Sequence, residues 1–215
     1  MSIIRIERKI LEKNDAIASD NRKQFQEKNL LVINLLSSPG SGKTTLIERT
    51  ITNCKFSKQI AVIEGDVQTE LDAERIEKLN IPVVQIVTNG ACHLDAQLVR
   101  DAFQNLVDIN SRLLFIENVG NLVCPAGYNL GEDHKVTVIS VTEGEDKPLK
   151  YPAVFRNSTA LVINKIDLLP YLNISLQVIK SNAWKINPKL EIFEVSCITG
   201  EGIEKWCNWL NSLIR

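Results

Sequence analysis

A phosphate-binding motif follows the first long apolar segment of this chain of 215 residues. The segment Leu31 to Leu36 leads directly into Ser37-Ser38-Pro39-Gly40-Ser41-Gly42-Lys43-Thr44, and a helical pattern begins there. In such a strand–loop–helix unit, glycines let backbone N–H groups point at phosphates, the lysine reaches the β- and γ-phosphates, and the threonine binds Mg²⁺. The motif predicts a nucleoside triphosphate site. Its expected contact residues are Ser38, Pro39, Gly40, Ser41, Gly42, Lys43, Thr44 and Thr45.

Ser37 is a departure from the usual form of this motif, which has a glycine six residues before the lysine. Serine can make the turn at some conformational cost. The departure therefore weakens the match to the pattern more than it weakens the mechanism.

A second motif indicates which base is bound. The apolar strand Ala160 to Ile163 is followed by Asn164-Lys165-Ile166-Asp167. A carboxylate at a strand end accepts hydrogen bonds from both N1–H and the exocyclic amine of guanine, a pair that adenine does not offer. Ser196 to Gly200 follows another apolar strand and resembles the last loop of GTPases, whose backbone supports the base. GTP is therefore the predicted nucleotide, with the base bound by Asn164, Lys165, Asp167, Ser196 and Cys197.

Strands and helices alternate along most of the chain. Strands are predicted at 31–36, 60–64, 83–87, 113–117, 136–141, 161–164 and 192–195, and helices at 4–28, 43–53, 69–79, 94–107, 174–184 and 202–214. The strands are continuous apolar runs, as a parallel sheet covered on both faces requires. We therefore predict a doubly wound α/β fold of the P-loop NTPase type, with a mostly parallel seven-stranded sheet and ligands at its carboxyl edge. Residues 1–29 are predicted to form an N-terminal helical extension, and residues 30–215 the GTPase domain.

The composition argues against several kinds of partner. Lysine and arginine number 25 against 26 acidic residues, and a net charge of −1 predicts no binding to nucleic acid. The longest apolar runs have about seven residues, too few to cross a membrane, and the N-terminus shows no apolar signal segment, so a cytoplasmic location is expected.

The cysteines are odd in number and widely spaced, which in a reducing compartment predicts core thiols or metal ligands rather than disulfides. They are Cys54, Cys92, Cys124, Cys197 and Cys207.

Carboxylates at two strand ends are the expected partners of Mg²⁺. One strand ends in Glu64-Gly65-Asp66 and another in Glu117-Asn118-Val119-Gly120. An acid followed by a glycine three residues on fits a site where the acid holds Mg²⁺ or its water and the glycine N–H meets the γ-phosphate. The predicted Mg²⁺ ligands are Thr44, Asp66 and Glu117, and the predicted γ-phosphate contact is Gly120. The predicted catalytic residues are Lys43, Asp66 and Glu117, with Asp66 as the candidate that positions the attacking water.

Two further loops carry residues that can bind a transition metal. Cys92-His93 follows the third strand, and Cys124-Pro125 follows the fourth. In a doubly wound sheet both loops leave the same edge, so Cys92, His93 and Cys124 can converge on Ni²⁺ or Zn²⁺. Three ligands leave a tetrahedral site open to water or to a ligand from a partner. The spacing alone equally allows ordinary thiols that pack as small apolar groups.

The motifs together resemble the HypB family, the GTPases that assist nickel insertion into [NiFe]-hydrogenase. The stretches that carry the resemblance are Ser37–Thr45, Glu64–Asp66, Asn89–Ala96, Glu117–Pro125, Val141–Pro148, Asn164–Asp167 and Ser196–Gly202. The resemblance implies a metal site of Cys92, His93 and Cys124 near the switch loops, shared across a nucleotide-stabilised homodimer. It also implies GTP hydrolysis, with hydrogenase maturation proteins and the hydrogenase large subunit as partners.

The chain departs from some members of the family at its N-terminus. Those members carry a cysteine-rich nickel motif or a long histidine-rich stretch, whereas the histidines here are His93 and His134 alone. Tight N-terminal metal binding and nickel storage are therefore not expected, and the loop site must carry the metal function. His134 lies near the start of a strand, away from the nucleotide edge, and is interpreted as a structural or surface residue.

Alternative functions differ from this interpretation in particular motifs. The urease-maturation GTPases share the fold and a nickel role, but their metal motif resembles Cys-Pro-His, whereas here Cys92 and His93 are adjacent. A small-molecule P-loop kinase is disfavoured by Asn164 to Asp167 and by the lack of a basic lid segment. A regulatory GTPase without a metal is left open.

Overall fold

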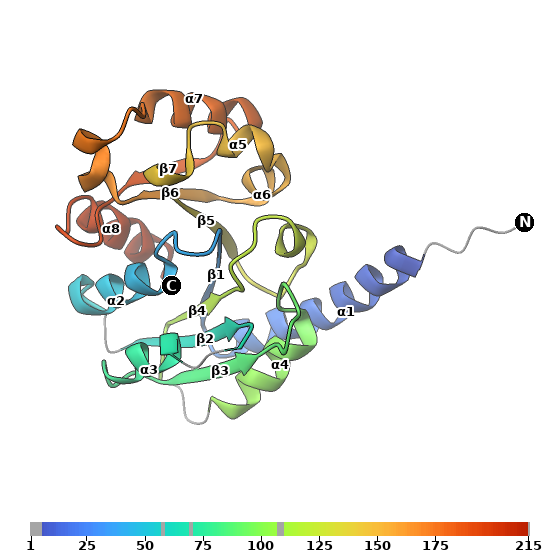
Figure 1. Cartoon of the computed structure of the whole chain (residues 1–215). Coiled ribbons are helices and arrows are strands. Elements are labelled where there is room, and N and C mark those ends of the chain that lie inside the picture. Colours follow the sequence, from blue (N-terminus) through green and yellow to red (C-terminus); the bar gives the residue numbers. More distant parts are fainter. Residues whose placement is uncertain (1–5, 57–58, 69–70, 107–109, 215) are drawn as a thin grey trace, which may run out of the picture.

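The computed structural model describes residues 6–56, 59–68, 71–106 and 110–214, which form a seven-stranded parallel sheet between helices (Figure 1). The strands are β1 (Leu31–Ser37), β2 (Ile60–Asp66), β3 (Val83–Val87), β4 (Leu113–Glu117), β5 (His134–Ser140), β6 (Ala160–Asn164) and β7 (Glu191–Glu194). They lie in the order β3-β2-β4-β1-β5-β6-β7, and every pairing is parallel. The predicted doubly wound α/β fold is confirmed. Because β1 lies between β4 and β5, the loop after β1 opens where the strand order reverses, the usual ligand position in such sheets.

The strands bury both of their faces, as their continuous apolar runs predict. In β1, Ile33 and Leu35 contribute to the core on one face, whereas Val32 and Leu36 contribute to the cores on the other. All four side chains are fully buried. This burial on two sides explains why the strands show no alternation between apolar and polar residues.

The longer helices cover the two faces in separate groups. On one face lie α2 (Lys43–Asn53), α3 (Leu71–Glu77) and α8 (Ile203–Leu213), and on the other lie α1 (Ile6–Glu27), α4 (Ala96–Asn105) and α7 (Leu176–Ile186). The short helices α5 (Lys147–Lys150) and α6 (Pro152–Asn157) were not predicted, because they are too short to show a helical period. Within the described ranges, no helix combines the length and the hydrophobicity needed to cross a bilayer.

The N-terminal helix α1 packs on the sheet through its C-terminal half, while its first turns project from the body (Figure 1). The ring of Phe25 meets Phe103 of α4 edge to face, with centroids 4.8 Å apart. The helix was expected over 4–28, of which residues 4 and 5 lie outside the described part. The division of the chain at residue 29 stays a prediction.

One prediction about the cysteines was wrong. The structure joins Cys54, at the end of α2, to Cys207 of α8 in a disulfide with a Cα–Cα distance of 5.4 Å. The two residues are 153 positions apart and meet because α2 and α8 pack side by side, so their spacing in the sequence gave no sign of the pair. Cys92, Cys124 and Cys197 are free thiols.

Candidate functional site

The predicted phosphate-binding residues surround a cavity of about 470 Å³ at the carboxyl edge of the sheet. Residues from the loop after β1, the ends of β2 and β4 and the start of α3 form its walls. They include Pro39, Gly40, Gly42, Lys43, Thr44, Thr45, Glu64, Asp66, Asp72, Arg75, Glu117, Gly120 and Lys165. The cavity therefore brings together residues predicted to contact phosphate, Mg²⁺ and base.

Lys43 and Thr44 are both held by the buried carboxylate of Glu117. The Thr44 hydroxyl donates to Glu117 Oε1 at 2.8 Å, and Lys43 Nζ lies 4.0 Å from the same atom. Burial raises the pKa of Glu117, while Lys43 and then Thr44 oppose that rise. Oε2 of Glu117 is buried without a hydrogen-bond partner. An orphaned carboxylate oxygen beside a threonine hydroxyl suits a hard cation such as Mg²⁺, because such ions prefer oxygen ligands.

The departure at Ser37 has a structural explanation. Ser37 is the last residue of β1, and its backbone is not left-handed. Its hydroxyl accepts a hydrogen bond from Lys43 Nζ at 2.8 Å and donates one to the Ser38 carbonyl at 2.6 Å. Serine at this position thus orients the lysine and does not strain the loop.

The base-reading motif is bonded directly to the phosphate loop. Asn164 Nδ2 donates to the Ser41 carbonyl at 2.9 Å, and Lys165 Nζ donates to the Gly40 carbonyl at 2.7 Å. Gly42 has φ 96°, and a Cβ atom there would collide with the Asn164 amide. Only glycine therefore allows the two motifs to approach this closely.

Asp167 and the loop after β7 lie together on the base side. The Ser196 hydroxyl donates to Asp167 Oδ1 at 2.6 Å, and the backbone N–H of Cys197 donates to Asn164 Oδ1 at 3.3 Å. Burial raises the pKa of the Cys197 thiol to about 11. Arg49 of α2 donates to the carbonyls of Cys197 and Ile198 and so supports this loop, a role that no sequence signal indicated.

Glu64 was not among the predicted site residues, although it lies beside Glu117. The two glutamates occupy the same register on the adjacent parallel strands β2 and β4. Glu64 Oε2 is buried without a hydrogen-bond partner, and carboxylate oxygens of Glu64, Asp66 and Asp72 lie within 4.8 Å of one another. Burial, followed by the charges of Glu117 and Asp66, raises the pKa of Glu64 to about 8. A cluster of three carboxyl groups suits a divalent cation, because such ions prefer oxygen ligands.

Glu64→Gln is expected to remove a pH dependence of stability in the metal-free protein. The folded-state pKa of about 8 exceeds the ordinary value of 4.5, so this group should cost the parent stability progressively as pH rises from about 4.5 to about 8. The variant should be the more stable protein at pH 8 by on the order of 2–4 kcal/mol. Urea unfolding at pH 5 and 8, with a chelator present, measures the difference. Glu77→Gln, at an exposed site, is the control, and parallel profiles for parent and Glu64→Gln would contradict the assignment.

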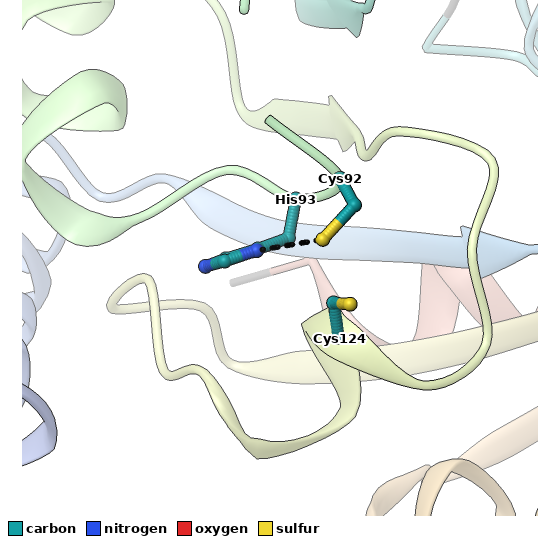
Figure 2. A group of neighbouring side chains, drawn as sticks. All are labelled: Cys92, His93 and Cys124. Atoms are coloured by element: carbon teal, nitrogen blue, oxygen red, sulfur yellow. Dashed lines mark hydrogen bonds between the residues drawn. The ribbon is translucent and has the colours of Figure 1, made fainter. Parts of the chain in front are cut away.

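The predicted transition-metal ligands also meet in the structure. Figure 2 shows Cys92 and His93 on one loop and Cys124 at the start of a short helix facing them. Their ligand atoms all lie within 4.8 Å of one another, and Cys92 Sγ is 3.6 Å from His93 Nδ1. Two sulfurs and one imidazole nitrogen form a donor set that suits Ni²⁺ or Zn²⁺ and leaves a position open.

The electrostatics of these side chains also fit a cation. Cys124, as a hydrogen-bond partner and then as a charge, raises the pKa of the Cys92 thiol, with burial acting in the same direction. Burial lowers the pKa of His93, while the charge of Asp95 opposes that shift; the net effect favours the neutral ring, the form that binds a metal. The ring of His93 lies against Tyr128, with centroids 4.0 Å apart.

His134, interpreted above, and Lys147, within the family stretch Val141–Pro148, both contact residues outside the metal cluster. His134 begins β5, where its ring packs edge to face with Trp209 and its Nδ1 lies 3.2 Å from Thr159 Oγ1, in line with a structural interpretation. Lys147 pairs with Glu143 at 3.2 Å, and Glu143 in turn accepts a hydrogen bond from the Ser41 hydroxyl.

Comparison with known proteins identifies the family. Residues 31–194 match the model of the CobW/HypB/UreG nucleotide-binding domain. The chain is 50% identical to the hydrogenase maturation factor HypB of Escherichia coli K12 over 98% of its length, and covers 72% of that protein. The chain belongs to the HypB family. The resemblance inferred from the motifs is thus confirmed.

Two solved HypB structures share the fold. HypB from Helicobacter pylori, determined in complex with nickel, superposes with a TM-score of 0.89 at 40% identity, covering 93% of this chain and 94% of that chain. HypB from Archaeoglobus fulgidus gives a TM-score of 0.89 at 37% identity, covering 95% of this chain and 100% of that chain. The P-loop fold predicted from the motifs and from the alternation of strands and helices therefore agrees with that of these HypB proteins.

Proposed function

We propose that this chain is a GTP-hydrolysing metallochaperone that delivers nickel for the maturation of [NiFe]-hydrogenase. The observation that carries the proposal is the Cys92–His93–Cys124 cluster, in which Cys124 lies on the loop after β4 that also carries Gly120. The HypB family membership supports the nickel assignment, as does the nickel complex of the H. pylori relative. Zn²⁺ suits the same ligands and is proposed as a second metal.

The nucleotide half of the mechanism rests on the residues around the cavity. Lys43 is placed to neutralise phosphate charge, and the backbone of the Gly40–Thr45 loop to bind phosphate oxygens. Mg²⁺, when bound, would neutralise charge between the phosphates, and Thr44, Asp66 and Glu117 are the residues proposed to hold it. Glu64 adds a buried carboxyl group with an unpartnered oxygen beside them. Asp66, at the end of β2, stays the candidate that positions the attacking water.

Leu94 is the proposed link between the nucleotide and the metal. Its backbone N–H donates to Asn118 Oδ1, directly after Glu117, at 3.1 Å. Its side chain packs so closely on Gly65 of β2 that a Cβ atom there would lie 2.8 Å from Leu94. Any shift at the ends of β2 and β4 on GTP binding would therefore move the loop that carries Cys92 and His93.

The proposed partners include a second copy of the chain. Val123, beside Cys124, is an apolar side chain that is 64% exposed, which suits a contact between copies in the GTP-bound state. Such a dimer would place two open metal sites on one interface. The hydrogenase maturation proteins and the hydrogenase large subunit are the proposed recipients of nickel, in the cytoplasm.

Equilibrium dialysis against Ni²⁺ and Zn²⁺, with a GTP analogue and with GDP, tests the proposal. The protein should retain metal, and the affinity should differ between the two nucleotide states. Light scattering under the same conditions should show dimers with the GTP analogue. A protein that hydrolyses GTP but retains no metal in either state would be a regulatory GTPase instead.

Asp167→Asn is expected to weaken GTP binding by roughly 2–4 kcal/mol, because the amide cannot accept both guanine donors. Xanthosine triphosphate offers a carbonyl in place of the amine, so its affinity should rise relative to that of GTP. Titration of both nucleotides into parent and variant measures the change. Unchanged GTP affinity in the variant would remove the guanine assignment.

A further inference from the structure

Three buried asparagines each tie together the two segments that carry the proposed metal ligands. The Cys92 segment (residues 92–96) follows β3, and the Cys124 segment (residues 119–130) follows β4. Asn14, Asn21 and Asn118 are 6%, 1% and 1% exposed. Two of them lie on α1, far from both segments in the sequence.

Asn118 bonds to the two segments at their strand ends. Its Oδ1 accepts from Leu94 N at 3.1 Å and from Val119 N at 3.0 Å. Its Nδ2 donates to Asn34 Oδ1 of β1 at 3.3 Å. The amide therefore anchors both ligand segments to the strand that leads into the phosphate loop.

Asn14, on helix α1, makes a second connection between the two ligand segments. Its Oδ1 accepts from Ala96 N at 2.9 Å, and its Nδ2 donates to the Asn129 carbonyl at 2.8 Å. These backbone partners fix the orientation of the amide, because one can only donate and the other can only accept. Asn14 also borders a cavity of about 400 Å³ whose wall includes His93 and Tyr128.

Asn21 makes a third connection about two helical turns further along α1. Its Nδ2 donates to the carbonyls of Ala96 and Leu130, at 2.8 and 3.1 Å. Arg100 of α4 donates to its Oδ1 at 3.2 Å and so satisfies the remaining acceptor. Ala96 thus has both its N–H and its carbonyl held by side chains of α1.

We propose that Asn14, Asn21 and Asn118 are positioning residues of the metal centre. This inference rests on the proposed metal function of Cys92, His93 and Cys124. The three amides fix the distance between the two ligand segments. Helix α1 therefore helps to position the metal ligands and is more than an N-terminal extension of the domain. Each amide both donates and accepts here. Asn14 does so with backbone groups of both kinds, whereas Asn21 and Asn118 each have one side-chain partner that complements their backbone partners.

The test uses the full chain with Asn14→Ala, and Phe25→Leu as a matched control. Phe25→Leu loosens the packing of α1 on α4 but removes no side-chain hydrogen bond to either ligand segment. Both variants should lower the melting temperature. Asn14→Ala should also weaken Ni²⁺ binding roughly tenfold, the lower end of the range for outer partners of metal ligands. Phe25→Leu should bind Ni²⁺ like the parent.

Alkylation of the metal-free protein supplies a readout that does not depend on metal. The thiols of Cys92 and Cys124 are half-buried, Cys197 is buried, and Cys54 and Cys207 are paired. Iodoacetamide should therefore modify Cys92 and Cys124 several-fold faster in Asn14→Ala than in the parent. Asn14→Asp keeps the acceptor for Ala96 N but loses the donor to Asn129, so it should accelerate alkylation of Cys124 more than that of Cys92.

The possible outcomes distinguish failure of the proposed metallochaperone function from failure of the proposed positioning role of the asparagines. A parent that retains no Ni²⁺ overturns the metallochaperone function, whatever the asparagine variants do. A parent that binds Ni²⁺, together with an Asn14→Ala variant of parental affinity and parental alkylation rates, overturns the positioning role. Equal losses of affinity in Asn14→Ala and Phe25→Leu overturn it as well, because general loosening of α1 would then be the cause.

Discussion

Replacing Lys43 with alanine is expected to lower the rate of GTP hydrolysis by at least about 100-fold, the scale of losing one preorganised charge contact to the transition state. In the structure Lys43 Nζ lies at the wall of the nucleotide cavity, between the Ser37 hydroxyl and Glu117. The other lysine in the described cavity wall, Lys165, follows β6 and does not belong to the phosphate loop. Phosphate release from saturating GTP, measured in parent and variant, tests the expectation.

The variant should keep its fold, because Glu117 can take up a proton when its cationic neighbour is lost. Its pKa is already raised by burial, and Lys43 is the first of the groups that oppose that rise. Lys180→Ala removes a partly buried lysine paired with Glu194 of β7 and serves as the control. If Lys43→Ala hydrolyses GTP at the parental rate, the Ser37–Thr44 loop is not the active phosphate site.

The sheet and the nucleotide loops could be predicted because their signals are local. Helix α2 and strands β3 and β4 have the predicted bounds, and the other strands differ by one or two residues at one or both ends. Helix α3 ends at Glu77, two residues before its predicted end, and its predicted first residues, 69 and 70, lie outside the described part. Continuous apolar strands and glycine-rich turns give these elements a strong pattern over a few residues.

The contacts that frame the site could not be predicted, because they join distant residues of unremarkable type. Asn14 and Asn21 lie in a charged helix whose few apolar positions indicate little about its buried face. The Cys54–Cys207 pair depends on how α2 packs against α8. Glu64 stands in a motif in which Asp66 was the more obvious ligand, and only the register of β2 and β4 places it beside Glu117.

Cys124→Ala is expected to weaken binding of Ni²⁺ and Zn²⁺ by at least about 100-fold. Loss of an outer partner of a metal ligand typically costs 10–100-fold, and Cys124 is itself one of three ligands proposed to contact the metal. Binding by the parent should weaken as pH falls, because the metal must displace thiol protons and the pKa of Cys92 is raised. The matched control is Cys197→Ala, which removes a buried free thiol outside the cluster. A Cys124→Ala variant that binds Ni²⁺ and Zn²⁺ with parental affinity would show that the metal lies elsewhere.

The same titrations, repeated with a GTP analogue and with GDP, should reveal coupling between the metal and the nucleotide. Gly120 packs against Pro39 of the phosphate loop, where a Cβ atom would lie 3.1 Å from it, and three residues separate Gly120 from Cys124. A γ-phosphate that moves Gly120 must therefore move Cys124, while Leu94 transmits the shift of β2 to Cys92 and His93. Metal affinities in the two states should differ by on the order of 1–3 kcal/mol, and metal must change the nucleotide affinities by the same factor. Equal affinities in both states would leave a GTPase whose metal site does not respond to its switch.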